Sequence, residues 1–302
     1  MEILKTLDDI VEKVKGKERR LVVAGGNAPT VIESIGKAVR EKIIKATLIG
    51  DKEGILALSE KHGIDPSSFD IIEEKDPPKT AFKAVEFVRE GKADFLMKGF
   101  ISTAEYTRPI LDKKNGLMGN SKLLTHVTVI QVPTYHKLMI ISDIAILVSP
   151  DLSQKIAMLE FCIEIANRLG LKEPKAGIIS CVEVPSYKID STIDGAIIKK
   201  LAKRAQVKGA VVDGPLAIDL AVSKRCAEEK KFESPVAGDC DILIFPDISS
   251  ANVFFKTLGI FAGARIAGVV VGAQVPCILT SRADTEESKF VSIALGALLT
   301  CK

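Results

Sequence analysis

Residues 79–99 read KTAFKAVEFVREGKADFLMKG. In the first half, apolar residues recur at helical spacing, at Phe82, Val85 and Val88. Because glycine commonly follows the last turn of a helix, Gly91 indicates where this helix ends, and we expect a helix over 79–90. The short apolar run 94–98 then predicts a buried strand that stops at Gly99. A helix, a strand and a glycine turn in this order are typical of α/β proteins.

The same order recurs along the chain. Leu21–Ala24 is an apolar run that enters Gly25-Gly26-Asn27, and we expect a helix to begin near Pro29. Further strands are predicted over 46–49, 175–181, 206–212, 242–245 and 267–272, a helix over 153–169, and a strand and a final helix within 275–302. Long turns are expected over 213–219, 234–241 and 245–256. This alternation predicts a parallel sheet with helices on both faces.

The composition argues against several classes of function. The 302 residues carry 42 basic and 39 acidic side chains, a net charge of +3 that is too balanced to indicate a nucleic-acid-binding surface. With three His and no Trp, no multi-histidine metal centre is expected, and His126 and His136 are interpreted as structural. The six cysteines form no CxxC pair, which is typical of core residues in a reducing cytoplasm. We therefore expect a cytoplasmic protein with neither a metal site nor a nucleic-acid partner.

No membrane association is expected. The start, MEILKTLDDIVEKVKGKERR, has no apolar segment before a small-residue cleavage site, so no secretory signal is predicted. The most apolar stretches, 139–148 and 266–279, are interrupted by polar residues or glycine and are shorter than the roughly 20 residues that span a bilayer. They predict buried strands instead.

Two glycine-containing turns lie where α/β proteins bind anions, after a strand and before a helix. The Gly25-Gly26-Asn27 turn lacks GxGxxG and GxxxxGK[ST] patterns, so a tight turn is the simpler explanation of its glycines. The second turn combines Lys98 and Gly99 with the hydroxyls of Ser102 and Thr103 and, one helical turn on, Arg108. These groups suit a phosphate or pyrophosphate. A serine N-cap with a solvated arginine explains them equally well.

The stretch 276–285 reads PCILTSRADT and has the same design. A buried strand brings Ser281, Arg282 and Asp284 to its end, just before a helix predicted to begin near Thr285. A hydroxyl, a cation and a carboxylate side by side can orient an anion and manage a proton. A helix cap by Asp284 or Thr285, with Arg282 in a structural ion pair, is the simpler alternative.

Together these residues resemble the phosphate acetyl/butyryltransferase family, most closely its phosphate butyryltransferase branch. Five pieces in order carry the resemblance: ADFLMKG (93–99), ISTAEYTRPIL (101–111), DGPLAIDLAV (213–222), SPVAGDCDILIFPDISSANVFFKTL (234–258) and ILTSRAD (278–284). The resemblance implies reversible transfer of a short-chain acyl group, butyryl or similar, between coenzyme A and inorganic phosphate. It implies no metal and no tightly bound cofactor, the coenzyme A thioester being a substrate, and a homodimer or higher homo-oligomer.

The resemblance also implies a fold of two α/β lobes with a central cleft, similar to isocitrate and isopropylmalate dehydrogenases. We expect residues 1–143 with 272–302 to form one lobe and residues 144–271 to form the other. The family's catalytic Ser-Arg pair falls on Ser281 and Arg282, with Asp284 in the SRAD form. Its substrate-binding positions fall on Lys98, Gly99, Ser102, Thr103, Arg108, Asn252 and Lys256.

One position departs from the family pattern. Acetyl-transferring members place an acidic residue seven positions after the motif serine, and this chain has Ser288 there. Asp284 and Glu287 are the nearby carboxylates, so the resemblance assigns no general base. An acetyl-CoA-specific enzyme remains an alternative, as do a metal-dependent dehydrogenase on the same fold and a non-catalytic, two-lobed small-molecule binding protein.

Overall fold

The computed structural model describes residues 2–119, 121, 123–281 and 284–301. The chain divides into two compact units, one made of Leu7–Leu124 with Ala267–Lys302 and the other of Met1–Thr6 with Thr125–Ile266. We call them the 7–124 unit and the 125–266 unit. These bounds differ from the expected division at 143/144 and 271/272, because the strands before residue 143 pair with the later strands of the 125–266 unit.

The 7–124 unit alternates strands and helices as its sequence predicts. Its strands are β1 (Arg19–Ala24), β2 (Ile44–Gly50), β3 (Asp70–Glu73), β4 (Phe95–Lys98), β11 (Cys277–Ile278) and most of β10 (Arg265–Val271). Its helices are α1 (Leu7–Val14), α2 (Pro29–Arg40), α3 (Lys52–Lys61), α4 (Pro77–Arg89), α5 (Thr103–Ile110) and α11 (Glu286–Thr300), with a 3₁₀ turn at Pro66–Ser68. The predicted helix over 79–90, the strand over 94–98 and the closing strand and helix are confirmed.

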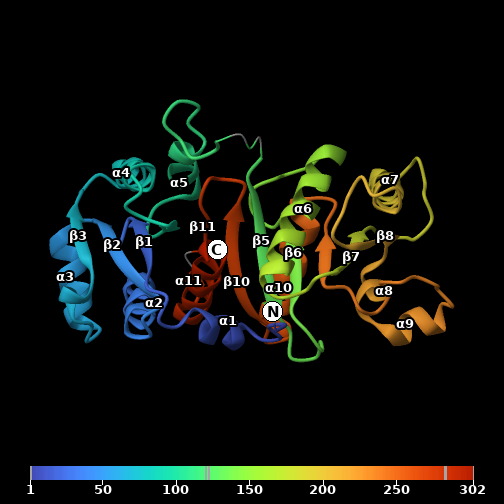
Figure 1. The fold of residues 1–302 in the computed structure, drawn as a ribbon, viewed down its shortest axis with the longest axis horizontal. Coiled ribbons are helices and arrows are strands. Elements are labelled where there is room, and N and C mark those ends of the chain that lie inside the picture. Colours follow the sequence, from blue (N-terminus) through green and yellow to red (C-terminus); the bar gives the residue numbers. More distant parts are fainter. Residues whose placement is uncertain (1, 120, 122, 282–283, 302) are drawn as a thin grey trace. The chain divides into compact units, whose positions relative to one another are not determined.

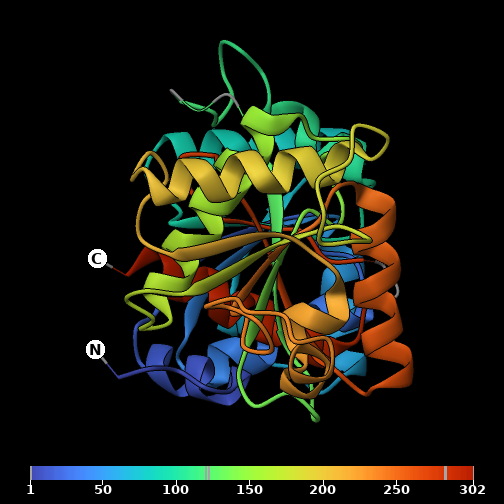
Figure 2. The same cartoon turned by 90° about the vertical axis from the view of Figure 1, so that its right-hand side faces the viewer.

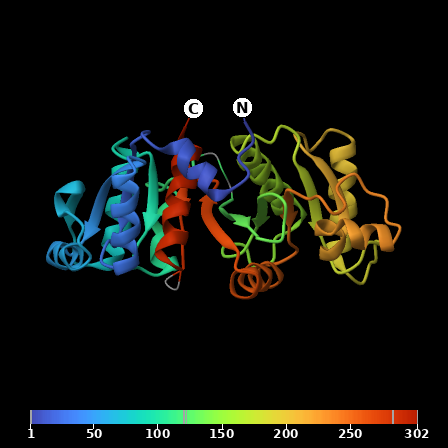
Figure 3. The same ribbon diagram turned by 90° about the horizontal axis from the view of Figure 1, so that it is seen from below.

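The sheet of this unit runs in the order β3-β2-β1-β4-β11-β10. All pairs are parallel except β11 with β10. Helices α1, α2 and α11 pack together, and α4 packs against α5 and the strands β1, β2 and β4, as Figures 1 and 3 show. One residue of the predicted apolar stripe differs: Phe82 is 48% exposed, whereas Val85 and Val88 are buried.

The 125–266 unit has a second run of strands in the order β5-β6-β9-β7-β8. They are β5 (Thr125–Gln131), β6 (Met139–Ser142), β7 (Lys175–Ile179), β8 (Val211–Leu216) and β9 (Ile242–Ile244). The helices are α6 (Leu152–Arg168), α7 (Asp190–Lys203), α8 (Ile218–Val222), α9 (Lys224–Glu229) and α10 (Ile248–Phe261). Helix α7 packs on β8 and β7. Helix α10 is the long helix near the C-terminal end of this unit (Figure 2).

Two sequence predictions in this unit are wrong. The strand expected over 206–212 lies instead at Val211–Leu216, so the residues Gly214 and Pro215 of the expected turn are inside β8. Strand β8 is the last strand of its run. Proline has no N–H to donate, and an edge strand tolerates this because its outer side has no neighbouring strand to bond.

The second error is the turn expected over 245–256, most of which is the helix α10. The Asp247 carboxylate caps this helix by accepting a hydrogen bond from the Ser250 amide at 2.9 Å. Apolar residues then recur at helical spacing, and Ala251, Phe254, Phe255 and Leu258 pack on the unit's core. Ser249, Ser250 and Asn252 lie at other positions of the same helix.

The α/β fold class is confirmed by the parallel strands and the helices that connect them. Among the described residues, no helix combines the length and apolar character needed to cross a membrane.

Candidate active site

Strands β4 and β11 are parallel neighbours, with Leu96 beside Cys277 and Met97 beside Ile278. The segments that follow them therefore leave the sheet at the same edge. This register brings together two stretches that are 180 residues apart in sequence, the one after Lys98 and the one that contains Ser281. Ligands of α/β proteins bind at this kind of edge, outside the carboxyl ends of the strands.

Lys98 is the last residue of β4, and only 4% of it is exposed. Its ammonium donates to the carbonyl oxygens of Gly99 and Ile101, at 3.4 and 3.2 Å. The cation thus stabilises the turn after β4 from inside. Its predicted contact with a substrate remains a prediction.

Gly99 lies against the first glycine turn of the chain. The Gly99 amide donates to the Ala24 carbonyl at 2.8 Å, and the next amide, of Phe100, donates to the Gly25 carbonyl at 2.6 Å. A side chain at Gly99 would overlap the Gly25 carbonyl, and Gly25 itself has a φ of +78°. The glycines of both turns are therefore explained by contact between the two backbones.

Ser102 forms a capping box at the N-terminus of α5. Its hydroxyl accepts from the Glu105 amide at 3.2 Å, and its own amide donates to the Glu105 carboxylate at 2.7 Å. The cap predicted as one alternative is thus confirmed. Thr103 and Arg108 are exposed on the same helix, and within the described part of the chain no carboxylate pairs with Arg108.

After β11, the described residues Ser281 and Asp284 are joined by hydrogen bonds between their own polar groups. The Ser281 amide donates to the Asp284 carboxylate at 2.6 Å, and the Asp284 amide donates to the Ser281 carbonyl at 3.2 Å. Thr285 caps α11 by accepting from the Ser288 amide at 3.1 Å. Of the two caps considered from the sequence, Thr285 is the one present, and the Asp284 carboxylate binds the Ser281 amide instead. Arg282, predicted to be catalytic, lies outside the described residues.

Lys289, which was not singled out in the sequence, contacts both Ser281 and Asp284. It lies in α11, is 3% exposed, and donates to the carbonyl oxygens of Asp284 at 2.6 Å and Ser281 at 3.3 Å. Burial lowers the pKa of its ammonium, and the nearby Asp284 carboxylate opposes that shift. A lysine near the start of the otherwise apolar stretch FVSIALGALL was the signal available in the sequence.

Two of the carboxylates near Ser288, those of Asp284 and Glu287, are engaged. Glu287 forms an ion pair with Lys37 at 2.8 Å, and Asp284 accepts from the Ser281 amide. Ser288 occupies the position where acetyl-transferring relatives of the resembled family place an acid, and its amide is bound by the helix cap. We therefore assign neither Asp284 nor Glu287 as a general base.

Asn252 and Lys256 belong to the 125–266 unit, one helical turn apart on α10. The Asn252 amide donates to the Ile144 carbonyl at 3.0 Å, and Lys256 is exposed. The segment that accepts this hydrogen bond is organised by Asp143, which is 1% exposed and was not singled out in the sequence. Asp143 accepts from the amides of Ala145 and Ile146, at 2.7 and 2.8 Å.

The other oxygen of Asp143 accepts from the Thr125 hydroxyl and the His126 amide, both at 2.8 Å. The carboxylate thus has four donors. His126 contributes its backbone here, while its ring contacts the Thr128 hydroxyl at 3.1 Å, which agrees with a structural role.

An apolar pocket of about 540 Å³ lies in the 125–266 unit, where β7 and β9 end and α10 begins. Its walls are mostly hydrocarbon, with four hydroxyls and one thiol: Ile179, Ser180, Cys181, Ser191, Ile218, Phe245, Pro246, Ser250, Val253, Phe254 and Thr257. Residues of α10 in this wall flank Asn252 and Lys256 in sequence. Asn252 and Lys256 are not themselves among the lining residues, and the apolar walls suit an apolar chain.

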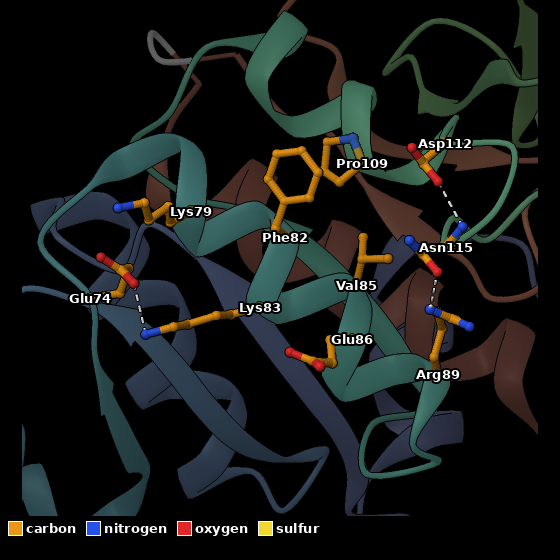
Figure 4. Close-up of a pocket in the computed structure, with 10 residues that line it drawn as sticks. All are labelled: Glu74, Lys79, Phe82, Lys83, Val85, Glu86, Arg89, Pro109, Asp112 and Asn115. Atoms are coloured by element: carbon orange, nitrogen blue, oxygen red, sulfur yellow. Dashed lines mark hydrogen bonds and ion pairs between the residues drawn. The ribbon is translucent and has the colours of Figure 1, made fainter.

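A second pocket, of about 450 Å³, lies in the 7–124 unit between α4 and α5 (Figure 4). The exposed Phe82 ring faces Pro109 there. Three cations line it and are balanced by three carboxylates, and Lys83 is already paired with Glu74 at 2.7 Å. With this balance the pocket offers no net charge for an anion, and we assign it no ligand.

Among the described residues, no group of three or more His, Cys, Asp and Glu side chains is arranged to hold a metal ion.

Comparison with known families matches residues 5–81 and 77–297 to the family described as "Phosphate acetyl/butaryl transferase". The chain is 42% identical over 293 residues to a phosphate acetyltransferase of Thermotoga maritima, a match that covers 97% of this chain and 99% of that one. It is 39% identical over 298 residues to a phosphate butyryltransferase of Clostridium acetobutylicum, with 98% and 99% covered.

Among solved structures, a branched-chain phosphotransacylase from Enterococcus faecalis V583 superposes with a TM-score of 0.81 at 29% identity, over 93% of this chain and 99% of that one. A 4-hydroxythreonine-4-phosphate dehydrogenase from Klebsiella pneumoniae is similar in fold alone, with a TM-score of 0.51 at 15% identity over 94% and 100%. The expected similarity to a dehydrogenase fold agrees with this second match.

Proposed function

The chain belongs to the phosphate acetyl/butyryltransferase family and is a phosphate acyltransferase, and we propose that it moves butyryl or a similar short-chain acyl group between coenzyme A and inorganic phosphate. One observation carries the assignment of the site. The register of β4 and β11 brings the turns that begin at Lys98 and Ser281 to one edge of the sheet. These two turns hold most of the residues that the family resemblance nominates.

The reaction is a single displacement in a ternary complex. A phosphate oxygen attacks the thioester carbonyl carbon, a C–O bond forms, and the tetrahedral intermediate then expels the thiolate of coenzyme A as the C–S bond breaks. The thiolate takes up a proton to leave as the thiol. We assign to the exposed Ser281 hydroxyl the role of donating to the developing oxyanion or to the departing sulfur, and to Arg282 the role of holding the phosphate. Losing one oxyanion donor typically costs about 10²–10³ in rate.

No side chain is needed as the nucleophile, because an oxygen of the phosphate attacks the thioester itself. Much of the rate gain then comes from holding two reactants in contact, which is worth up to about 7–11 kcal/mol in favourable cases. The cations Lys98, Arg108 and Lys256, with Gly99, Ser102, Thr103 and Asn252, are proposed to hold the phosphates and pantetheine arm of coenzyme A. No tightly bound cofactor is required, and we propose a cytoplasmic location because coenzyme A is the substrate.

The acyl preference is proposed to be butyryl or branched, with acetyl as the alternative. Relatives with both printed activities match at similar identity, 42% for the acetyl and 39% for the butyryl enzyme. The apolar pocket of about 540 Å³ favours the longer chain. Because one methylene changes binding by only about 1–3 kcal/mol, the preference is expected to be graded.

We further propose a homodimer or higher homo-oligomer. Apolar side chains on α10 are exposed, including Val253, Ile260 and Phe261. Exposed apolar side chains that cluster on one helix are typical of association surfaces. Light scattering after size exclusion tests this, and a monomer at micromolar concentration would contradict it.

The activity is tested by measuring coenzyme A thiol release from acetyl-, butyryl- and isobutyryl-CoA, each with and without phosphate. We expect release only with phosphate, fastest with a four-carbon chain. Ser281→Ala is expected to lower kcat by about 10²-fold or more, while Ser67→Ala, at an exposed serine of the 3₁₀ turn, is the matched control. If the rate of thiol release were the same with and without phosphate for every acyl-CoA, the proposed function would be refuted. An acyl-enzyme trapped by mass spectrometry would refute the single displacement.

A further inference from the structure

The apolar pocket of the 125–266 unit has a buried base and an open rim. Ile179, Ser180 and Phe245 are at most 7% exposed and form its base. Cys181 and Thr257 are exposed and form its rim. Ile179 and Phe245 also belong to the buried core of the unit, so an apolar group that filled the pocket would extend that core. The volume of about 540 Å³ is within the range of roughly 300–1,000 Å³ that is typical of small-molecule sites.

The serine hydroxyls in the wall already have partners within the protein. Ser180 and Ser191 bond each other, with 2.7 Å between the two hydroxyl oxygens. The Ser250 hydroxyl donates to the Asp247 carbonyl at 2.9 Å. None of the described residues that line the pocket is an Asp, Glu, Lys, Arg or His. The pocket therefore offers no counter-charge to a charged ligand.

Only one part of the two proposed substrates matches this chemistry. Phosphate and the nucleotide end of coenzyme A are anionic, and burying a charge without a partner is unfavourable. The acyl chain of the thioester is hydrocarbon and is stabilised by leaving water. The pocket also lies where the parallel strands β7 and β9 end, which is where ligands of such sheets bind. The acyl chain is therefore the part of the substrates that the pocket fits.

Two helices supply the side chains that limit the size of the pocket. Ser250, Phe254 and Thr257 recur at helical spacing, so they share one face of α10. The Phe254 ring packs on Phe245, with 5.1 Å between the two ring centroids. Ile218, the first residue of α8, also lines the pocket and, like Phe254, is partly buried against the core. Changes at Ile218 or Phe254 therefore alter the space that is left for a ligand.

We propose that this pocket is the acyl subsite, that Ile218 and Phe254 set the chain length it accepts, and that its uncharged wall excludes acyl groups with a charged end. This inference rests on the proposed function, because the acyl group is taken from it. The inference goes further by naming the residues that select the acyl group and the class of acyl group that is rejected.

The first experiment compares butyryl-CoA with succinyl-CoA. Both acyl groups have four carbons, and succinyl has a carboxylate where butyryl has a methyl group. We expect kcat/KM for succinyl-CoA to be at least about 10³-fold lower, because its carboxylate would be buried without a partner. 3-Hydroxybutyryl-CoA adds only a hydroxyl and should lose about 10²-fold or less. Similar kcat/KM values for butyryl- and succinyl-CoA would overturn the exclusion of charged acyl groups.

The second experiment changes the size of the pocket. Ile218→Trp should lower kcat/KM for butyryl-CoA by about tenfold or more and that for acetyl-CoA by less than about threefold. Phe254→Leu should raise kcat/KM for hexanoyl-CoA relative to butyryl-CoA by about threefold or more. The matched control is Ile197→Trp, at an α7 isoleucine that is 37% exposed and does not line the pocket. If Ile218→Trp does not fold, Thr257→Trp at the exposed rim is expected to have the same effect and decides the matter.

Two kinetic outcomes overturn the inference even if the unsubstituted protein is active. One is an equal change for acetyl- and butyryl-CoA in the tryptophan variants, and the other is no difference from Ile197→Trp. A Thr257→Trp variant that changes the oligomeric state in light scattering and lowers all activities alike would assign the pocket to contact between copies of the chain. That result would also overturn the inference.

Protection of Cys181 from iodoacetamide separates this failure from failure of the proposed function, because it needs no turnover. Butyryl-CoA should slow the labelling of Cys181 by about tenfold at saturation, and coenzyme A without an acyl group should slow it less. Ile218→Trp should abolish the difference between the two ligands. Such a pattern supports the acyl subsite even if no phosphate-dependent thiol release is seen. Equal protection by both ligands in the unsubstituted protein refutes it.

Discussion

The Gly99 amide and the Gly25 carbonyl belong to backbones so close that neither turn has room for a side chain between them. The next amide, of Phe100, donates to the Gly25 oxygen at 2.6 Å. This contact joins the turn after β1 to the turn after β4, and it fixes where the chain leaves the sheet toward α5. The proposed anion-binding edge therefore depends on a backbone contact that only glycine permits.

Gly99→Ala is expected to destabilise the protein by about 1–3 kcal/mol or more, because the new methyl group would overlap the Gly25 carbonyl and force the backbones apart. Urea unfolding measures the change. Gly259→Ala is the control, since Gly259 lies in α10 and its added methyl would meet only the Ile266 side chain, at 3.5 Å. Alanine in a helix should stabilise by roughly 0.5–1 kcal/mol. Equal effects of the two substitutions would contradict the steric explanation.

Asp143→Asn should cost about 1–3 kcal/mol or more of stability, because an amide NH₂ would replace one of two oxygens that together accept four hydrogen bonds. It should also raise the KM for acyl-CoA, since the same segment accepts the hydrogen bond of Asn252. Asp151→Asn is the control, as asparagine replaces aspartate well at the N-cap of α6. A variant with normal stability and KM would show that the carboxylate is not required.

Asp239 gives stability a defined pH dependence. Its burial favours the neutral form, but hydrogen bonds from Lys175, Lys137 and His136 outweigh that effect and hold the pKa of the carboxyl well below its usual 3.8. Because the pKa is lower in the folded state, these interactions stabilise above about pH 4 and are lost as the pH falls further.

Asp239→Asn should therefore lower the free energy of unfolding at pH 7, by a few tenths to about 1 kcal/mol for each partly exposed pair. The difference from the unsubstituted protein should shrink as the pH falls from 5 toward 2.5. Asp70→Asn is the control, because Asp70 is exposed and forms no ion pair among the described residues. Chemical unfolding at a series of pH values checks this, and a difference constant across that range would be evidence against the cluster.

The six cysteines should differ sharply in reactivity. Burial raises the pKa of the Cys240 and Cys277 thiols to about 12 and raises that of Cys162 as well. At pH 8 only about one in 10⁴ of a thiol with a pKa near 12 is ionised, so alkylation should be very slow. Cys181 is exposed and lines the apolar pocket.

Iodoacetamide followed by mass spectrometry should therefore label Cys181 first, and Cys162, Cys240 and Cys277 only in denaturant. If the pocket holds part of the substrate, butyryl-CoA should slow the labelling of Cys181, while Cys226 serves as the internal control outside the pocket. If butyryl-CoA did not change the rate of Cys181 labelling, the pocket would not be part of the proposed substrate site.

Much of the architecture followed from local patterns. The stripe of Val85 and Val88 and the glycine at 91 placed α4 correctly, because both reflect forces within a few residues. The wrong predictions concern residues whose structure depends on contacts distant in sequence rather than on local conformational preference. Gly214 and Pro215 indicate a turn by themselves, but they lie in β8 because an edge strand tolerates them. Phe82 fits an apolar stripe, yet it is exposed beside Pro109 because α5 covers only part of α4.

The candidate site divides in the same way. The sequence by itself determined the family, since five motif segments carry the resemblance, and that resemblance predicts the Ser281-Arg282 pair as catalytic. It could not place Ser281 beside the Lys98 turn, because that neighbourhood depends on the pairing of β4 with β11 across 180 residues. Nor could it show that Lys98 and Lys289 are buried and directed to carbonyl oxygens. Burial and hydrogen-bond partners are properties of the packed chain, and only the tertiary structure decided them.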